Sequence, residues 1–155
     1  MLKTIKRMGP CLQALPVAVL ALFIGCGSDG VSPEEHHAPA GVAVWAGEDR
    51  LLEVVGQEVE GELRVQAGSE TELLEVVFLD EAGVPVPQEP GTYLEVEVED
   101  TQVAAWHASN PGDFSARLQG IGVGSTQAVF RLMHGMIGSG HPDDVSPAVA
   151  VDVSP

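Results

Sequence analysis

Histidine and aspartate side chains gather near the end of the chain, around a glycine-rich segment. His134 and His141 flank the six residues 135–140, and Asp143 and Asp144 follow closely. Imidazole and carboxylate groups together suit zinc, copper or nickel ions. A loop of this length could bring both histidines onto one ion. The four residues are therefore a candidate site for a divalent transition metal, with Zn or Cu as the expected ion.

The same residues also have a purely structural interpretation. The spacing of His134 and His141 does not match a compact zinc motif such as His-Glu-x-x-His. His134 could end a strand beside the core residue Leu132, with His141 merely solvated. The two interpretations differ in geometry, because a shared ion needs the imidazole nitrogens about 3–4 Å apart so that each lies about 2.0–2.1 Å from the metal.

Other arrangements that could do chemistry are weaker. Glu95, Glu97 and Glu99 alternate with apolar residues and could meet a calcium ion, but such a row is typical of a solvated strand face that protects a sheet edge. The glycine-rich stretch 120–125 has no lysine after it and precedes a strand, so it does not suit a phosphate. No Gly-x-Ser-x-Gly segment occurs. We therefore expect a protein that is not an enzyme.

Charge limits the partners of the chain. The 155 residues carry a formal net charge of −16, and beyond Arg7 only four arginines and no lysine face 23 acidic residues. Such a surface repels phosphate backbones and anionic lipid. No nucleic acid is expected as a partner.

The N-terminus has the pattern of an export signal. Three basic residues precede an apolar run at positions 12–24, which is shorter than the roughly 20 residues of a membrane span but suits the core of a secretory signal. Phe23 and Ile24 end this run, and Gly25 and Cys26 follow it directly. This end resembles the lipobox of bacterial lipoproteins, although leucine is usual at the place of Phe23 and a small residue at that of Ile24. An ordinary cleaved signal, with an incidental Cys26, is the alternative.

The resemblance to lipoproteins implies export to the cell envelope and a lipid anchor. Cleavage before Cys26 would remove residues 1–25 as a signal peptide, and acylation of Cys26 (palmitate is a typical acyl group) would hold the exported protein on the membrane of the cell envelope. Gly27 after the cysteine favours the outer membrane if the host has two. Residues 26–41 have no hydrophobic period and predict a flexible tether. His36 and His37 lie in this tether, where they could collect a metal ion.

From residue 42 to 155 the sequence predicts one all-β domain. Short apolar or alternating runs recur with turn signals between them, at 42–45, 51–55, 61–67, 71–79, 93–99, 103–106, 114–118, 125–133 and 148–153. No run has a sustained helical period. Seven to nine strands of this kind are typical of a single antiparallel immunoglobulin-like β-sandwich, with an eight-stranded barrel as the alternative. Residues 71–79 are apolar on both faces, which favours a central, doubly covered strand.

The second half of this domain carries a family resemblance. Residues 100–104 (Asp-Thr-Gln-Val-Ala) precede a strand, and a glycine-rich hairpin follows around Gly120 and Gly124. This pattern resembles group 2 of the bacterial immunoglobulin-like domains, over about residues 61–153. The resemblance implies an extracytoplasmic sandwich used for adhesion, spacing or carbohydrate contact, with no catalytic residues.

Two functions follow as expectations. The first is a non-catalytic, membrane-anchored envelope lipoprotein whose immunoglobulin-like module is structural or binds an envelope protein or a glycan. The alternative is a periplasmic or surface metal-binding protein that uses His134, His141 and Asp143 or Asp144.

Overall fold

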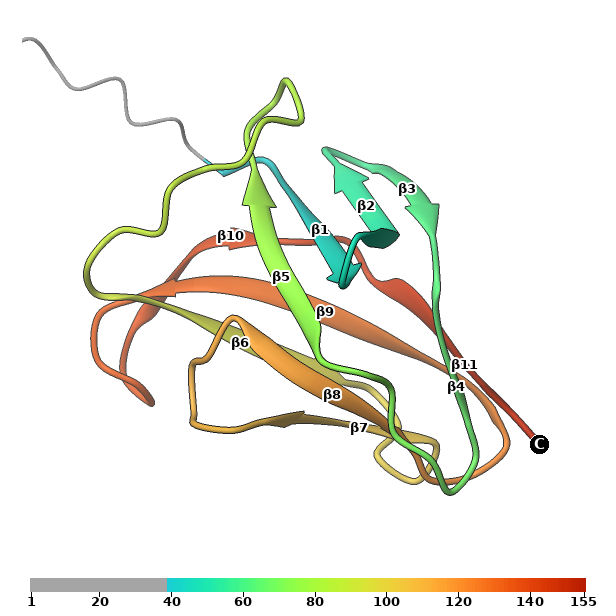
Figure 1. Ribbon diagram of the computed structural model, residues 1–155. Helices are drawn as coiled ribbons and strands as arrows, with labels where there is room; N and C mark the ends of the chain where they lie inside the picture. The colour runs from blue at the N-terminus through green and yellow to red at the C-terminus, as the bar shows by residue number, and fades with distance from the viewer. Residues whose placement is uncertain (1–38) are drawn as a thin grey trace, which may run out of the picture. The chain divides into compact units, whose positions relative to one another are not determined.

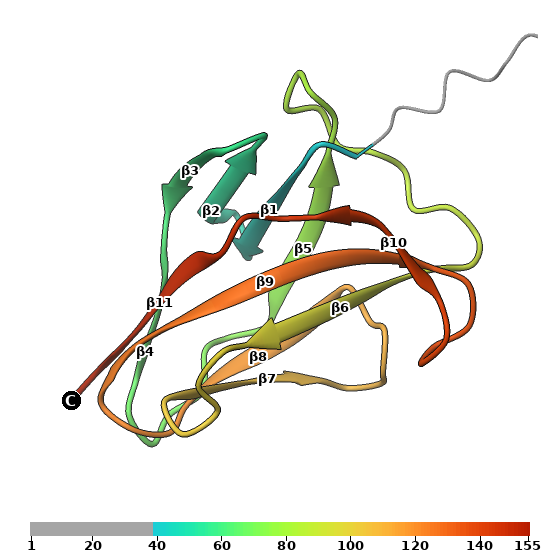
Figure 2. The same ribbon diagram turned by 180° about the vertical axis from the view of Figure 1, so that it is seen from behind.

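The computed structural model describes residues 39–155, which form eleven β-strands and contain no helix. The strands form two sheets, as Figures 1 and 2 show from opposite sides. The expected signal peptide, Cys26, His36, His37 and most of the expected tether lie outside the described residues. The predicted all-β sandwich is confirmed, and the two separate sheets remove the barrel alternative.

The first sheet has six strands. Its spatial order is β3 (Glu58–Gly61), β2 (Asp49–Val55), β1 (Gly41–Ala46), β5 (Leu74–Leu79), β8 (Ser115–Gly120) and β7 (Ala104–Ala108). Every pairing in it is antiparallel. This sheet faces the viewer in Figure 1.

The second sheet has five strands and is built around the longest one. Its strands are β10 (His141–Val145), β9 (Gly124–His134), β11 (Val149–Ser154), β4 (Leu63–Gln66) and β6 (Thr92–Val98). Strand β6 pairs with one side of β9, while β10 and β11 share the other side (Figure 2). The pair β11–β4 is parallel, so the predicted antiparallel arrangement has one exception.

The core lies between the sheets and is filled mainly by valine and leucine. Its largest fully buried side chains are Phe130, Leu52, Leu63, Leu74 and Leu118. Trp106 packs edge-on against Phe130, with ring centroids 5.6 Å apart. In β4 the predicted alternation is confirmed, because Leu63 and Val65 are buried while their neighbours are exposed.

The structure corrects three strand predictions. Residues 39–155 contain eleven strands, not seven to nine, since β3 and β10 were not expected. The expected strand 61–67 begins only at Leu63, because Gly61 has a φ of 88° and ends β3 instead. β5 lies inside a sheet, between β1 and β8, as expected. Its second face is not fully covered, however, because Glu75 is exposed there.

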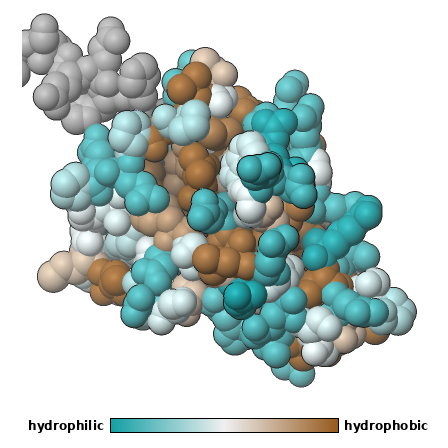
Figure 3. All heavy atoms as spheres, viewed as in Figure 1, coloured by the Kyte–Doolittle hydropathy of each residue, from teal (hydrophilic) through white to brown (hydrophobic). Residues whose placement is uncertain are grey.

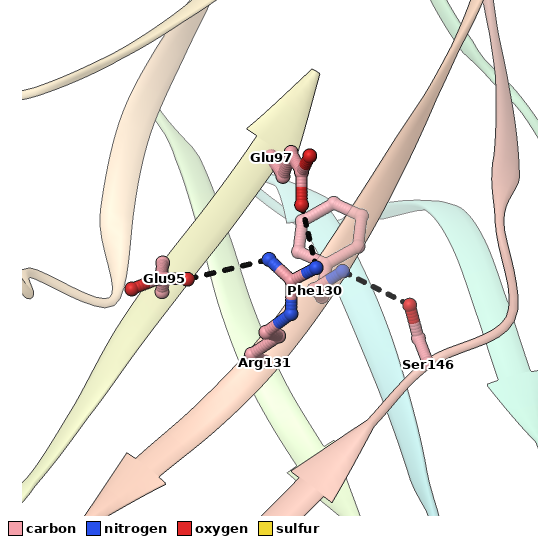
Figure 4. Close-up of polar contacts among 5 residues, drawn as sticks. All are labelled: Glu95, Glu97, Phe130, Arg131 and Ser146. Atoms are coloured by element: carbon pink, nitrogen blue, oxygen red, sulfur yellow. Dashed lines mark hydrogen bonds and ion pairs between the residues drawn. The ribbon is translucent and has the colours of Figure 1, made fainter. Parts of the chain in front are cut away.

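The glutamate ladder of β6 faces a cation on β9. Arg131 lies directly opposite Glu95 in the antiparallel register. Its guanidinium donates to Glu95 Oε1 at 3.3 Å and to Glu97 Oε2 at 2.5 Å, as Figure 4 shows. Two of the three ladder carboxylates are therefore paired with an arginine, which leaves the calcium interpretation without support among the described residues.

Candidate metal centre

The histidines of the candidate site face each other across a hairpin. β9 ends at His134 and β10 begins at His141, and these two residues are partners in the antiparallel register. The register then shifts between Pro142 and Asp144, which makes Asp143 the extra residue of a β-bulge. Bulges redirect side chains and are common beside functional sites. β10 pairs with β9 alone among the described strands, so Pro142 sits on an edge strand where its missing N–H is tolerated.

Three ligand-type side chains converge at this hairpin. His134 Nδ1 lies 3.4 Å from Asp143 Oδ2, and His141 Nε2 lies 3.4 Å from Asp143 Oδ1. One ligand atom from each of the three residues fits within a mutual separation of 4.8 Å. The two imidazole rings are stacked, with centroids 5.8 Å apart and planes inclined by 23°. Asp143 thus presents one carboxylate oxygen to each histidine.

The contacts of Asp143 are too long to lock the group together. Both N···O separations of 3.4 Å exceed the 2.7–3.2 Å of an ordinary N–H···O hydrogen bond. The side chain of His141 is 74% exposed, so its ring can move without disturbing the core. The arrangement can therefore contract around an ion at little cost in packing.

A tyrosine anchors the loop that joins the two strands. Tyr93, on β6, is buried and donates from its hydroxyl to the carbonyl of Met136 at 3.3 Å. Gly140 lies against it, since a Cβ there would stand 2.7 Å from the Tyr93 hydroxyl and 2.5 Å from the His134 carbonyl oxygen. Only glycine fits at this position. The loop is therefore held close to the end of β9, and it places His141 opposite His134.

The start of β6 packs against the other side of the His134 ring. A Cβ on Gly91 would lie 3.5 Å from His134 Nε2, and the carbonyl of Gly91 accepts the N–H of Gly135 at 2.9 Å. Gly91 has a φ of 89°, which glycine adopts without strain. His134 consequently turns Nδ1 toward Asp143 and Nε2 toward β6, so Nδ1 is its ligand atom.

The structure brings together three of the predicted metal ligands and leaves Asp144 aside. Asp144 lies opposite Leu132 in the register and is not one of the three grouped residues. Burial raises the pKa of Asp144 above its ordinary value, and a backbone hydrogen bond from Val145 opposes the rise. His36 and His37 fall outside the described residues.

Sequence reasoning missed the residues that support this group. Tyr93 lies on β6 and Gly91 directly before it, about forty positions upstream of His134, and no local pattern links them to that histidine. In the sequence, Gly140 is only one residue of the glycine-rich loop 135–140. One signal was available: the six residues 135–140 include three glycines, which favour a turn that brings His134 and His141 together.

Comparisons with known proteins give little. No protein-family model and no curated protein matches the chain. Among solved structures, the chain is similar to the crystal structure of domains 4 and 5 of the S-layer protein SbsC, with 20% identity and a TM-score of 0.44 over 76% of this chain. The match spans 66% of that chain, just under two thirds of its length. Within residues 39–155, no helix has the length and apolarity needed to span a membrane.

Proposed function

We propose that this chain is a non-catalytic, lipid-anchored envelope protein whose sandwich binds a divalent transition metal through His134, His141 and Asp143. The observation that carries the metal site is the convergence of three ligand atoms within 4.8 Å on one hairpin. The lipid anchor rests on Cys26 and on the apolar run before it.

The distances suit a tetrahedral ion. Ligands at about 2.0–2.2 Å from a tetrahedral zinc ion lie about 3.4 Å from one another. One oxygen of Asp143 already stands at this distance from His134 Nδ1, and the other oxygen stands at this distance from His141 Nε2, so either oxygen has one such partner. A modest movement of the exposed His141 ring brings the widest separation into the same range. The three protein ligands leave a fourth position open, as in zinc sites that bind water or another molecule.

The donor types select the kind of metal. Two imidazole nitrogens and one carboxylate favour zinc, copper or nickel over calcium and magnesium, which prefer oxygen ligands alone. We propose Zn²⁺ or Cu²⁺ as the ion. The acidic surface raises the local concentration of any divalent cation and assists capture without choosing among metals.

Calorimetric titration of the intact chain with Zn²⁺, Cu²⁺ and Ca²⁺ tests the metal site. We expect one ion per chain for zinc or copper and no saturable binding of calcium to this site. Replacing both histidines (His134→Ala with His141→Ala) should abolish the binding, whereas His107→Ala, which removes a histidine from β7, should not. Transition-metal binding that survives the double substitution would place the ion elsewhere and overturn the proposal.

The anchor has a separate test. In cells that express the chain and are fed labelled palmitate, the chain should carry the label. Cys26→Ser should prevent the labelling of the chain. The other cysteine supplies a matched control, since Cys11→Ser lies within the proposed signal and should leave labelling unchanged. Equal labelling of both variants would exclude Cys26 as the lipidated residue.

A hollow on the outer face of the first sheet favours glycan contact as a second candidate function. Val42 and Val44 point into the core, so Ala43 and Trp45 lie on the other face of β1, where they line the hollow together with Val77 of β5. Trp45 lies between Arg50 and Glu75 of the neighbouring strands. A half-buried indole beside charged hydrogen-bonding groups suits a sugar, whose C–H face can pack on the ring.

Sedimentation with insoluble peptidoglycan tests this second function. The chain should sediment with the glycan, and Trp45→Ala should reduce the bound fraction. Val123→Ala changes a residue that is 61% exposed and outside the hollow, so it serves as the control. Equal sedimentation of both variants would exclude the hollow as the contact.

A further inference from the structure

An apolar pocket opens beside the candidate metal centre. It has a volume of about 300 Å³ and lies between β5 of the first sheet and β6 and β9 of the second, beneath the segment 86–89. Figure 3 shows apolar surface over β5, bordered by hydrophilic residues. The apolar lining includes Phe78, Phe114, Val77, Val86 and Leu132. Its volume is at the lower end of the range of small-molecule sites.

The pocket and the metal centre share one residue. Asp143 lines the pocket, and its two carboxylate oxygens face His134 and His141. An ion held by these three residues would therefore be bonded to one residue of the pocket lining, while its two histidine ligands lie outside that lining.

The walls define the body of such a molecule. Phe78 and Phe114 meet edge to face, with ring centroids 6.2 Å apart, and aliphatic side chains complete the lining. Aromatic rings favour this edge-to-face contact with a further ring. A small phenyl or alkyl group fits these surroundings.

The charges define its head group. Among the described residues, the charged members of the pocket lining are Glu89 and Asp143. Without metal, this lining disfavours an anion. A divalent ion on two neutral imidazoles and one carboxylate leaves a net positive charge on the metal group itself, although Glu89 adds a second carboxylate to the lining. Bound cations reverse the local electrostatics of a site.

We infer that the pocket binds a small carboxylic acid with an apolar body, whose carboxylate takes the open position of the metal ion. This inference rests on the proposed metal site. It implies coupled binding: the ion raises the affinity for the acid, and the acid raises the affinity for the ion by the same factor.

Phenylpropionate and Zn²⁺ are the probes for the test, with the intact chain and calorimetry as the readout. The zinc-loaded chain should bind phenylpropionate at least about tenfold more tightly than the metal-free chain, within the usual range of coupling between sites. Saturating phenylpropionate should strengthen zinc binding by the same factor. Phenylpropanol has the same body without the carboxylate, so its affinity should not change with zinc.

Two substitutions on one loop separate the pocket from the metal. Val86 lines the pocket, and its backbone N–H donates to the carbonyl of Phe78, so Val86→Trp fills the space without removing that bond. Val84, two residues earlier, is 55% exposed and does not line the pocket. Val86→Trp should abolish phenylpropionate binding and leave zinc affinity alone, and Val84→Trp should change neither.

The outcomes distinguish the two proposals. If zinc binds at the cluster but phenylpropionate binds equally with and without it, the coupled site is wrong and the metal site stands. Zinc-dependent binding of phenylpropionate that Val86→Trp does not weaken would place the acid outside the pocket and overturn the inference. If zinc does not bind at all, the proposed metal site is wrong, and the inference that rests on it is wrong as well.

Discussion

Ser146 forms both backbone hydrogen bonds of Phe130, one with its own backbone and one with its side chain. The Ser146 N–H donates to the Phe130 carbonyl at 2.9 Å. The Ser146 Oγ accepts the Phe130 N–H at 3.0 Å, as Figure 4 shows. The hydroxyl in turn donates to the carbonyl of Pro147 at 2.8 Å. β10 ends at Val145, so the serine side chain replaces the carbonyl that a continuing strand would offer. A break between two strands is thereby accommodated without a buried, unpaired N–H.

Ser146→Ala should destabilise the fold. The substitution leaves the Phe130 N–H without an acceptor at a fully buried residue, which costs about 1–3 kcal/mol. Urea unfolding followed by circular dichroism would measure the difference in the free energy of unfolding.

Ser125 provides the comparison for this measurement. Its hydroxyl donates to Asp152 Oδ1 at 2.9 Å in an exposed setting, so Ser125→Ala should change the free energy of unfolding by less than about 0.5 kcal/mol. If both variants lost equal stability, the buried hydrogen bond of Ser146 would not be the cause.

The strands that could be predicted are those in which apolar and polar residues alternate, because this alternation indicates that one face is buried. β6 alternates valine and leucine with glutamate, and β4 alternates apolar with polar residues, so both periods were visible. β3 could not be predicted, because all four of its residues are exposed and the strand exists only by pairing with β2. Long-range hydrogen bonding has no signature in local hydropathy.

The grouping of the candidate metal ligands could be predicted in part from local sequence. His134, His141 and Asp143 are close in sequence, so one loop sufficed to bring them together. The strand that positions two of them, β10, contains Pro142 and two aspartates, which have low β propensity. The choice between Asp143 and Asp144 depended on a bulge in the register, and a bulge of one residue cannot be located from composition.

Phe130→Ala should be among the most destabilising single changes. The side chain is fully buried and packs edge-on against Trp106, so removing the ring leaves a cavity between the two sheets. Truncation of a buried phenylalanine costs about 3–5 kcal/mol. Thermal unfolding should show a lowered Tm. Val123→Ala, at a residue that is 61% exposed, should leave the Tm within error. A Phe130→Ala variant as stable as Val123→Ala would contradict the placement of Phe130 in the core.

Gly140→Ala should lower the affinity for zinc. The added Cβ meets the His134 carbonyl and the Tyr93 hydroxyl, so the loop must move away from the end of β9 and carry His141 with it. Gly138→Ala is the matched change in the same loop. Gly138 has a positive φ of 84° but open space around its Cβ, so alanine strains the turn without displacing the histidine. Calorimetry should give a zinc affinity lowered severalfold for Gly140→Ala alone. Equal losses would mean that general strain in the loop, not the position of His141, controls binding.

Asp143→Asn and Asp144→Asn together test which carboxylate belongs to the proposed metal site. A ligand that binds only the folded state stabilises it, by about 2.7 kcal/mol when its concentration is a hundredfold above Kd. Zinc should therefore raise the Tm of the unmodified chain. Asp143→Asn removes the negative charge that faces both imidazoles and should abolish most of this increase. Asp144→Asn alters a half-buried carboxyl outside the group and should preserve the increase. If the zinc-induced rise in Tm is lost in Asp144→Asn and kept in Asp143→Asn, the ligand is Asp144 and the proposed coordination is wrong.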